Sequence, residues 1–379
     1  MAVYLDCNST TPLEPSVASL VSRFMERDYG NAASPIHDFG IFARMAVEHA
    51  RGQLAELVAA RREEVIFTSG ATEANNIALL GLAEYGLASG RRHVIGSVIE
   101  HKAVLEPLEE LQRLGFAVEL LPAGADGRVA PEALAAALRP DTLLVSLMQV
   151  NNETGVAQPL ADYAALLAGH PAYWHVDAAQ GFGKQIAPLQ NPRIDLISAS
   201  GHKIYGPKGV GVLIARRREN NPPPLRSLMY GGGQEQGLRP GTLPVPLIAG
   251  LGEAAKLALR DNEQRIKTCL AFRREALDAL AELSPLYNGD QQQTLPHCLN
   301  LSLPGIAADR AIAALKPLVA VSSTSACTSH TRTPSHVLAA MGFSGARVEC
   351  AFRMSWCHLT PPVDWPAVVA TLKRLQQGG

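Results

Sequence analysis

A single cysteine stands in a strongly polar stretch near the end of the chain. Cys327 lies in SSTSACTSHTRT, residues 322–333, where most side chains carry a hydroxyl group. This composition predicts an exposed, mobile loop and not a packed element. His330 and Arg332 follow, and a nearby cation stabilises a thiolate. A reactive thiol and an incidental surface cysteine both fit this stretch, so the rest of the chain must decide.

A lysine in a glycine-rich segment is the second candidate for chemistry. Lys203 lies in SASGHKIYGPKGVG, residues 198–211, directly after an apolar run. Glycine lets the backbone approach a ligand closely. A lysine in a dry pocket loses its proton and can form a Schiff base. The segment is not a P-loop, because the glycine spacing differs and no Ser or Thr follows Lys203 or Lys208.

Three further polar groups follow apolar runs. Asp177 ends YWHVD, and a buried carboxylate there needs a cationic partner, either a ligand or a neighbouring arginine. TSGATEANN, residues 68–76, predicts an anion site at a helix start or an ordinary helix cap. His101 is catalytic or structural. A Schiff-base lysine, a phosphate site and an acidic partner for a pyridinium nitrogen are together what pyridoxal phosphate requires.

The elements that must hold these groups alternate along residues 50–250. Seven short apolar runs predict strands: EEVIFTSG, HVIGSVIE, FAVELLPA, LLVSLMQV, YWHVDA, DLISAS and GVGVLIARR. Helical patterns lie between them, including ATEANNIALLGLAEYG, AVLEPLEELQRLG and PEALAAALR. This predicts a mainly parallel sheet covered on both faces, with ligands at the carboxyl ends of its strands. GGGQEQGLRPGT predicts a long flexible loop, and the last hundred residues predict a smaller α+β unit.

Composition excludes several classes of protein. The chain has 379 residues, a net charge of −1 and 5% aromatic residues, so it lacks a basic face or stacking platform for nucleic acid. Neither a signal peptide nor a run of membrane-spanning length is visible. The six cysteines show no C-x-x-C spacing, which speaks against a disulfide framework or zinc site. We therefore expect a cytoplasmic protein without a metal site or membrane contact.

Ten segments together resemble the cysteine desulfurases, enzymes with the class V aminotransferase fold. They are YLDCNSTTPL with YGNAASPIHDFG, FTSGATEANN, EHKAV, VNNETG, HVDAAQ, SGHKIYGPKGVG, GGGQEQGLRPGT, SACTS and FRMS, in the family's order over almost the whole length. The resemblance implies fold type I: a large domain with a mainly parallel seven-stranded sheet and a smaller α+β domain. It places the N-terminal segment, residues 1–15, against the small domain, with the large domain at 16–250 and the small domain at 251–379.

The resemblance also implies roles, with pyridoxal 5'-phosphate as cofactor. Lys203 would be the Schiff-base lysine, Asp177 the partner of the ring nitrogen, and His101 the group stacked on the ring. The remaining positions would contact the cofactor or the substrate: Gln180 and Asn152 at the phenolic oxygen or carboxylate, Thr72, Ser200 and His202 at the phosphate, Thr242 at the neighbouring subunit's phosphate, and Arg353 and Asn31 at the substrate carboxylate.

The implied reaction converts L-cysteine to alanine and leaves a persulfide on Cys327 for transfer to an acceptor protein. The implied assembly is a homodimer. Two departures from the family are Thr324 before SAC and Trp356–Cys357–His358 after Arg353. The sequence given ends soon after its last predicted helix, so we do not expect the tail by which housekeeping iron–sulfur desulfurases engage their scaffold. The SACTS…TPSHVLAAMG stretch is similar to desulfurases of DNA phosphorothioation. A selenocysteine lyase, another enzyme of this fold and a weakly catalytic sulfur carrier are the alternatives.

Overall fold

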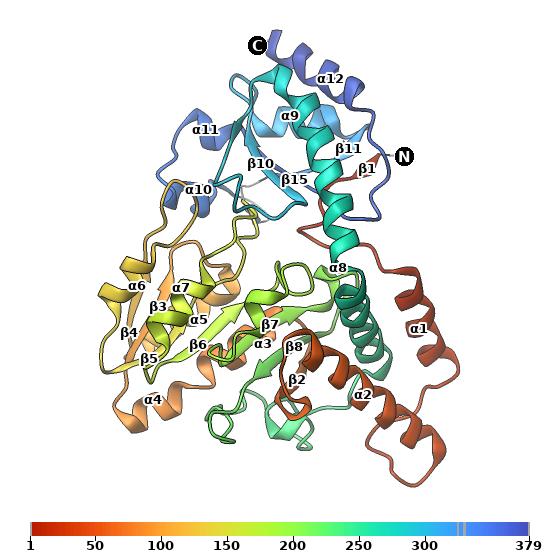
Figure 1. Ribbon diagram of the computed structural model, residues 1–379, viewed down its shortest axis with the longest axis vertical. Coiled ribbons are helices and arrows are strands. Elements are labelled where there is room, and N and C mark those ends of the chain that lie inside the picture. The colour runs from red at the N-terminus through yellow and green to blue at the C-terminus, as the bar shows by residue number, and fades with distance from the viewer. Residues whose placement is uncertain (1, 324–325, 329–330, 378–379) are drawn as a thin grey trace.

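The computed structural model describes residues 2–323, 326–328 and 331–377, and for residues 326–328 and 331–333 it describes the backbone only. Figure 1 shows a broad lower body built on a large sheet and a smaller upper body, joined by one long helix. Thr324 and Ser325 lie outside the described residues, as does the side chain of Cys327.

The large sheet has seven strands, one for each apolar run. They are β2 (Val65–Thr68), β3 (His93–Ser97), β4 (Ala117–Leu121), β5 (Thr142–Ser146), β6 (Tyr173–Asp177), β7 (Leu196–Ser200) and β8 (Gly211–Ala215), in the order β2-β8-β7-β6-β5-β3-β4. Strand β8 pairs antiparallel with both neighbours, and the pairs β7-β6, β6-β5, β5-β3 and β3-β4 are parallel. The predicted mainly parallel, seven-stranded sheet is confirmed.

Alternate residues of these strands enter two separate cores, because successive side chains of a strand point to opposite faces. One core joins Val145, Val176 and Val212 to helices α2 (Asp38–Leu57), α6 (Pro131–Ala137) and α7 (Leu160–Leu167). The other joins Leu144 and Leu213 to helices α3 (Ala71–Leu80), α4 (Ala83–Ser89) and α5 (Lys102–Arg113). The sheet is therefore covered on both faces, which holds its strand ends still.

One predicted helix is two helices. The stretch ATEANNIALLGLAEYG was expected to be continuous, but α3 ends at Leu80 and α4 begins at Ala83. At the junction Gly81 donates to Ile77, and the carbonyl of Gly81 accepts a hydrogen bond from Arg226 N–H at 2.9 Å. A side chain at Gly81 would meet Ile77 O at 2.3 Å, so the close approach requires glycine.

The smaller body contains a four-stranded sheet in the order β12-β15-β10-β9, with strands β9 (Leu286–Tyr287), β10 (Cys298–Ser302), β12 (Ser322–Ser323) and β15 (Ala351–Ser355). Its helices are α9 (Ala308–Leu315), α10 (His336–Ala340), α11 (Ala346–Glu349) and α12 (Trp365–Gln377). Helix α8 (Val245–Leu280) packs in the large core as far as Ala258 and in the small core from Cys269.

The N-terminal residues cross between the two bodies. Strand β1 (Val3–Tyr4) pairs with β11 (Val319–Ala320), and Leu5 packs in the core of the small body before α1 (Pro15–Glu26) begins. Short 3-10 turns complete the described elements: η1 (Arg62–Glu64), η2 (Ala187–Gln190), η3 (Gly201–Lys203), η4 (Glu235–Gly237) and η5 (Ala281–Leu283). The large-plus-small architecture is confirmed, and the division at residues 15 and 250 stays a prediction.

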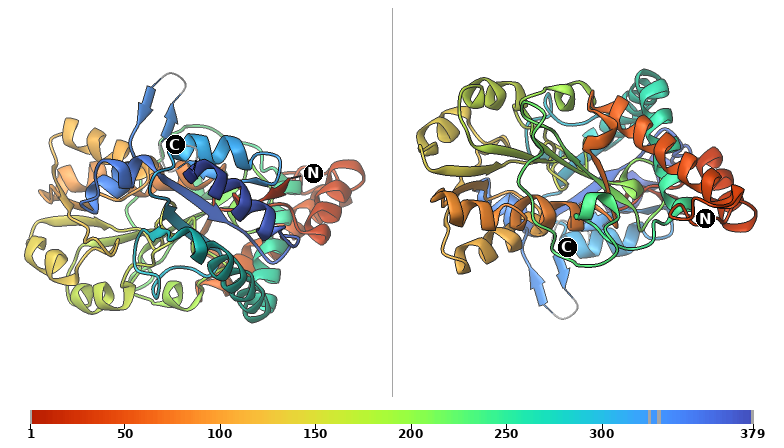
Figure 2. Two further views of the ribbon diagram at one scale, coloured as in Figure 1. Left: turned by 90° about the horizontal axis from the view of Figure 1, so that it is seen from above. Right: turned by 90° about the horizontal axis from the view of Figure 1, so that it is seen from below.

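Two predicted loops have more structure than expected. Cys327 lies in β13 (Ala326–Thr328), which pairs antiparallel with β14 (Thr331–Thr333) in a hairpin that projects from the molecule (Figure 2). β-Branched threonines favour this extended pairing. In GGGQEQGLRPGT the buried carboxylate of Glu235 pairs with Arg51 at 2.7 Å and accepts from Phe67 N–H, which fastens that segment to the sheet.

The described part of the chain contains no helix with both the length and the apolar character that a bilayer crossing requires.

Candidate active site

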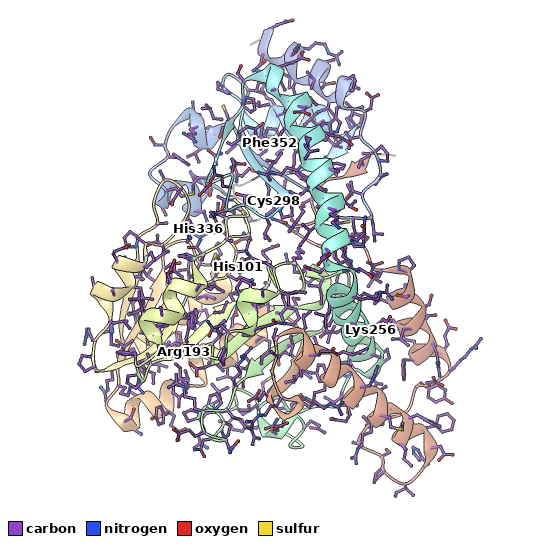
Figure 3. All side chains as sticks on the ribbon, in the orientation of Figure 1. His101, Arg193, Lys256, Cys298, His336 and Phe352 are labelled. Carbon is purple, nitrogen blue, oxygen red and sulfur yellow. The ribbon has the colours of Figure 1, made fainter. Side chains whose placement is uncertain are left out.

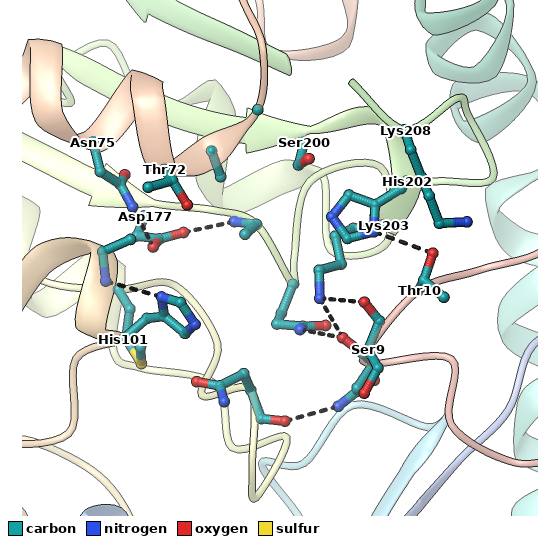
Figure 4. A pocket seen from close by; sticks show the side chains of 18 of the residues that line it. Ser9, Thr10, Thr72, Asn75, His101, Asp177, Ser200, His202, Lys203 and Lys208 are labelled. Carbon is teal, nitrogen blue, oxygen red and sulfur yellow. Dashed lines mark hydrogen bonds between the residues drawn. The ribbon is translucent and has the colours of Figure 1, made fainter. Parts of the chain in front are cut away.

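A cavity of about 800 Å³ lies between the strand ends of the large sheet and the N-terminal segment. Segments that follow β3, β5, β6 and β7 line it, together with the start of α3 and Arg353 from β15. Nine of the predicted site residues line this cavity: Thr72, His101, Asn152, Asp177, Gln180, Ser200, His202, Lys203 and Arg353. Figure 4 shows Lys203 and His202 on one side and His101 and Asp177 on the other.

Lys203 ends turn η3, directly after strand β7, and its ammonium group reaches the N-terminal segment. Its Nζ donates to the carbonyls of Asn8 at 2.5 Å and Ser9 at 2.9 Å. Burial is the main cause that lowers its pKa from 10.5 to about 7, and the positive charges of Lys184 and Arg353 contribute to this shift. This lysine therefore exists in part as the neutral amine near neutral pH, the form that attacks carbonyl carbon.

Asp177 ends β6 and is 6% exposed. Its Oδ2 accepts from the side-chain amide of Asn75 at 2.8 Å, and its Oδ1 accepts from Ala179 N–H at 2.9 Å. Among the described residues, no arginine or lysine forms an ion pair with it, so the salt-bridge alternative fails. Two neutral donors hold the carboxylate in place at the cavity wall and leave its charge available to a cationic ligand.

The start of α3 fits an anion better than an ordinary cap. Gly70 is the N-cap, and within the described residues no side chain caps the first turn. Thr72 and Ser200 lie at the cavity wall beside it, and a side chain at Gly70 would come within 3.5 Å of Ser200 Oγ. His202 contacts Thr10 Oγ1 through Nδ1 at 3.2 Å. Free N–H groups and hydroxyls at a helix start bind phosphate.

His101 is the N-cap of α5 and is oriented by that helix. Its Nδ1 accepts from Ala103 N–H at 3.0 Å. Partial burial lowers the pKa of the imidazole, so the ring is mainly neutral near pH 7. Because Nδ1 is an acceptor, the neutral ring carries its proton on Nε2, which faces the cavity (Figure 4).

Asn8 links the remaining polar groups. Its carbonyl accepts from Gln180 Nε2 at 2.9 Å as well as from Lys203, and its side chain donates to the carbonyl of Asn152 at 3.2 Å. Gln180 Oε1 is buried and has no partner within the described residues. An acceptor without a donor, on a residue that lines the cavity, is the kind of group that a bound molecule satisfies.

Arg353 enters the cavity from the small body. Its guanidinium is 7% exposed and donates to Asp6 Oδ1 at 2.6 Å, Ser9 Oγ at 2.9 Å and Asn152 O at 2.6 Å. Trp356 lies in the small core and His358 pairs with Glu14, so neither lines the cavity. The departures after Arg353 therefore leave the cavity wall unchanged.

Two predicted residues do not join this cavity. Thr242 and Asn31 are exposed and lie outside its lining.

The side chain of Cys327 lies outside the described residues, but both ends of its segment are placed. Ser322 pairs with Arg353 in the small sheet, and His336 contacts the carbonyl of Glu100, the residue before His101, at 3.0 Å. Figure 3 shows His101 and His336 at the junction of the two bodies.

Sequence reasoning gave no role to Asp6, Asn8, Ser9 or Asn75. The opening YLDCNSTTPL was part of the resemblance, yet nothing in it shows that backbone carbonyls would receive the lysine. Asn75 was detectable, because it lies three residues after Thr72 on the same helix face. Long-range pairs such as Asp6–Arg353 leave no local signal.

Known proteins agree with this arrangement. Residues 3–360 match the family model for the class V aminotransferases. The chain belongs to this family, within its cysteine desulfurase group. It is 43% identical over 365 residues to the cysteine desulfurase IscS of Salmonella arizonae, covering 95% of this chain and 89% of that protein. It is 42% identical over 374 residues to IscS of Methylococcus capsulatus, covering 98% and 92%.

Solved structures extend the likeness to the fold. DndA from Streptomyces lividans superposes with a TM-score of 0.83 and 50% identity, over 93% of this chain and 99% of that one. A NifS-like protein superposes with a TM-score of 0.89 and 34% identity, over 100% and 99%. SspA in complex with cysteine superposes with a TM-score of 0.82 and 34% identity, over 96% and 99%.

Class V aminotransferases depend on pyridoxal phosphate, and the residues of this cavity fit that group. The uncapped start of α3 suits a phosphate, the unpartnered Gln180 Oε1 suits a polar ring substituent, and Lys203 has a pKa low enough for covalent attachment. Asp177 offers its charge to a ring nitrogen. Within the described residues, no cluster of His, Cys, Asp and Glu side chains forms a metal site.

Proposed function

We propose that this desulfurase converts L-cysteine to L-alanine at the cavity and stores the released sulfur as a persulfide on Cys327. The observation that carries the proposal is one cavity in which Lys203, with its pKa lowered to about 7, lies together with the fixed carboxylate of Asp177 and the guanidinium of Arg353. Cleavage of an amino acid with pyridoxal phosphate requires three groups in one cavity. They are a lysine nucleophile, a carboxylate that pairs with the cationic ring, and an arginine that binds the substrate carboxylate.

The chain's own residues would hold pyridoxal phosphate at fixed points. Lys203 would attach it covalently, Asp177 would pair with the ring nitrogen, and Gln180 would contact the ring's phenolic oxygen. Thr72, Ser200 and His202 hold the phosphate at the start of α3. When bound, this cofactor withdraws electrons from the substrate and so weakens its bonds.

Substrate orientation falls to Arg353, with Asn152 beside it. A planar guanidinium binds a carboxylate through two parallel hydrogen bonds. In the described structure its terminal nitrogens already donate to Asp6, Ser9 and the carbonyl of Asn152, so an incoming carboxylate replaces one of these partners. Asn31, outside the cavity lining, assists only if its loop comes closer.

His101 acts as a proton donor. The hydrogen bond from Ala103 N–H to Nδ1 leaves the proton of the neutral ring on Nε2, at the cavity face. The imidazole would lie against the bound cofactor and would return a proton from Nε2 to the substrate's carbon skeleton. Its lowered pKa keeps positive charge off the ring, which avoids repulsion with Lys203.

The position of Ser323 supports a role of Cys327 in this chemistry. Ser323, in β12, lies four residues before it, and four extended residues span at most about 14 Å. The Cys327 thiolate attacks the sulfur of the substrate, an S–S bond forms and the C–S bond breaks. The electron pair of that bond stays with the carbon skeleton, which takes up a proton and leaves as alanine.

A homodimer completes the proposed assembly. The corner formed by α1 and α2 exposes large apolar side chains: Met25 at 58%, Tyr29 at 67%, Ile36 at 92%, Phe39 at 52%, Phe42 at 60% and Met45 at 61%. Monomeric proteins seldom expose so much apolar surface in one place. A second copy of the chain would cover this corner, and Thr242 would then reach the phosphate in the neighbouring cavity.

The sulfur acceptor is a protein in the cytoplasm, of the DNA phosphorothioation, iron–sulfur cluster or thiolation pathway. The 50% identity to DndA favours the first. Incubating the persulfidated enzyme separately with purified phosphorothioation proteins and with an iron–sulfur scaffold protein tests the choice. Transfer of labelled sulfur to the scaffold protein alone would reject phosphorothioation.

The activity itself is tested by incubating the purified enzyme with L-cysteine, pyridoxal phosphate and a thiol reductant. We expect alanine and sulfide in equal amounts. Pyruvate and ammonia in place of alanine would contradict a desulfurase.

A further inference from the structure

Two cysteines outside the cavity lie against each other behind it. Cys7 follows β1 in the N-terminal segment, and Cys357 follows β15. Together with Tyr205 they form a small buried cluster, and a hydrogen bond joins the two thiols. Both are free thiols in this structure. Backbone hydrogen bonds of Cys7 and Leu5 with Ser355 hold the two segments side by side.

The pair is open to a small reagent. Cys7 and Cys357 line a second cavity of about 420 Å³, whose wall includes Tyr4 at 39% and Leu359 at 41% exposure. Thr10 lines both this cavity and the one that holds Lys203. Cys7 and Cys357 are themselves 1% and 2% exposed, so a reagent of the size of hydrogen peroxide meets them from this cavity and not from the open surface.

The surroundings make one of the two sulfurs the nucleophile. Cys357 Sγ receives hydrogen bonds from the Cys7 thiol, the Thr360 hydroxyl at 3.6 Å and the Leu359 N–H. The Cys7 hydrogen bond is the main cause that lowers the Cys357 pKa, and the charge of Lys184 adds to it. The amine of Lys184 is buried and has no partner within the described residues. Donors gathered on one sulfur stabilise its thiolate.

We infer that Cys7 and Cys357 form an oxidation site at which hydrogen peroxide makes a disulfide that controls the active site. The Cys357 thiolate attacks one oxygen of the peroxide, the O–O bond breaks, and hydroxide leaves and becomes water. Cys7 sulfur then attacks the sulfenic sulfur of Cys357 and expels a second water, which carries the thiol proton of Cys7. Two thiols lose two electrons and two protons, and one peroxide becomes two waters.

The link to the active site runs through the neighbours of Cys7. Asp6 pairs with Arg353 at 2.6 Å, and the carbonyls of Asn8 and Ser9 accept from Lys203. An S–S bond is about 2 Å long, shorter than the contact between two separate thiols, so its formation draws the segment around Cys7 toward the chain after β15. That movement alters the partners of Arg353 and Lys203. The inference concerns regulation of the proposed desulfurase, yet the disulfide forms whether or not the activity is correct.

Peptide mass spectrometry tests the inference on the holoenzyme. After peroxide treatment, alkylation and digestion by trypsin without reductant, Cys7 lies in peptide 1–23 and Cys357 in peptide 354–373, each with a single cysteine. We expect the two peptides to be joined, two hydrogen atoms lighter than their sum, and separated by dithiothreitol. Unlinked peptides, or sulfinic acid on Cys357 without a link, would overturn the inference. A link from either peptide to Cys327 would overturn it as well.

Three variants sharpen the test. Cys7→Ser and Cys357→Ser should each lose the linked peptide, whereas Cys269→Ser, which removes another buried thiol close to the pair, should keep it. The cofactor spectrum checks that each variant is folded.

The effect on the active site is measured in a Cys327→Ser background, which removes the catalytic thiol. The absorbance of the cofactor measures the binding of L-cysteine. Oxidation should weaken this binding about tenfold, and dithiothreitol should restore it. The same oxidation should change nothing in Cys327→Ser with Cys7→Ser. If L-cysteine binding stayed unchanged in a sample with the Cys7–Cys357 disulfide fully formed, the disulfide would not control the active site.

Discussion

The substrate cavity and the β13–β14 hairpin carry the two halves of the proposed reaction, and they are built in opposite ways. Asp177 ends one buried strand and Lys203 follows another, in a sheet that is covered on both faces, and two hydrogen bonds fix each side chain. Cys327 lies in a three-residue strand of a two-stranded sheet that belongs to neither body. Electron withdrawal requires atoms in fixed positions, whereas sulfur delivery requires a thiol that meets both substrate and acceptor.

The largest effect that this comparison predicts follows from removing the lysine. Lys203→Ala should abolish covalent cofactor attachment and lower turnover by at least ~10³-fold, because a positioned proton-transfer group and nucleophile are both lost. Absorbance of the purified protein and alanine release measure the two losses. Lys208→Ala is the matched control, because Lys208 is exposed at the rim of the same cavity and should leave attachment intact. An active Lys203→Ala enzyme would refute the site.

Removing the negative charge beside the ring should come next. Asp177→Asn keeps the size of the side chain but cannot stabilise a protonated ring nitrogen, so turnover should fall about 10²-fold or more. The absorbance of the bound cofactor should change as well. Asp195→Asn is the control, because Asp195 pairs with Arg193 and Arg218 in a buried cluster away from the cavity. It should lower thermal stability and leave the cofactor spectrum unchanged. If Asp195→Asn changed the cofactor spectrum and Asp177→Asn did not, Asp177 would not be the partner of the ring nitrogen.

Substrate binding should respond less than turnover. Arg353→Lys keeps a positive charge but loses the two-pronged donor, so KM for L-cysteine should rise about 30-fold, equivalent to ~2 kcal/mol. Steady-state kinetics should show a smaller change in kcat. Arg347→Lys, which alters an arginine stacked on Phe343 in the small body, should leave KM unchanged. Equal KM values for wild type and Arg353→Lys would show that Arg353 does not bind the substrate carboxylate.

The pH dependence of cofactor attachment tests the electrostatics of the cavity. The pKa of Lys203 is lowered to about 7, so the amine is neutral above this pH and protonated below it. Attachment of pyridoxal phosphate to the apoenzyme should therefore be slow in acid, rise with pH and reach half its maximum rate near pH 7. Lys184→Met removes a positive charge that lowers this pKa and should move the midpoint upward. A midpoint near 10.5 in both proteins would contradict a buried lysine.

The smallest expected effect concerns the dimer. Thr242→Ala should weaken cofactor retention about fivefold, close to ~1 kcal/mol for one hydrogen bond, and Thr242→Ser should restore it. Dialysis followed by absorbance measures retention, and light scattering measures the assembly. A fully active monomer would show that neither Thr242 nor the apolar corner of α1 and α2 serves a second subunit.

The sequence predicted the cavity better than its surroundings. Strand ends and glycine-rich turns are local patterns, so Asp177, Lys203 and the start of α3 could be placed at one edge of a sheet before the structure was known. The carbonyls of Asn8 and Ser9 could not, because their contact with Lys203 joins segments almost two hundred residues apart. The hairpin was expected to be a loop because a polar stretch lacks apolar periodicity, although its threonines favour strands.

One measurement tests the division between cavity and hairpin directly. The wild-type enzyme is given one equivalent of L-cysteine labelled with radioactive sulfur, without reductant, and its tryptic peptides are analysed. Cys327 lies in peptide 311–332 and Cys357 in peptide 354–373. We expect the label on Cys327, released by dithiothreitol, and a Cys327→Ser variant that binds cysteine without taking up label. Label on Cys357, with Cys327 unmodified, would contradict the account.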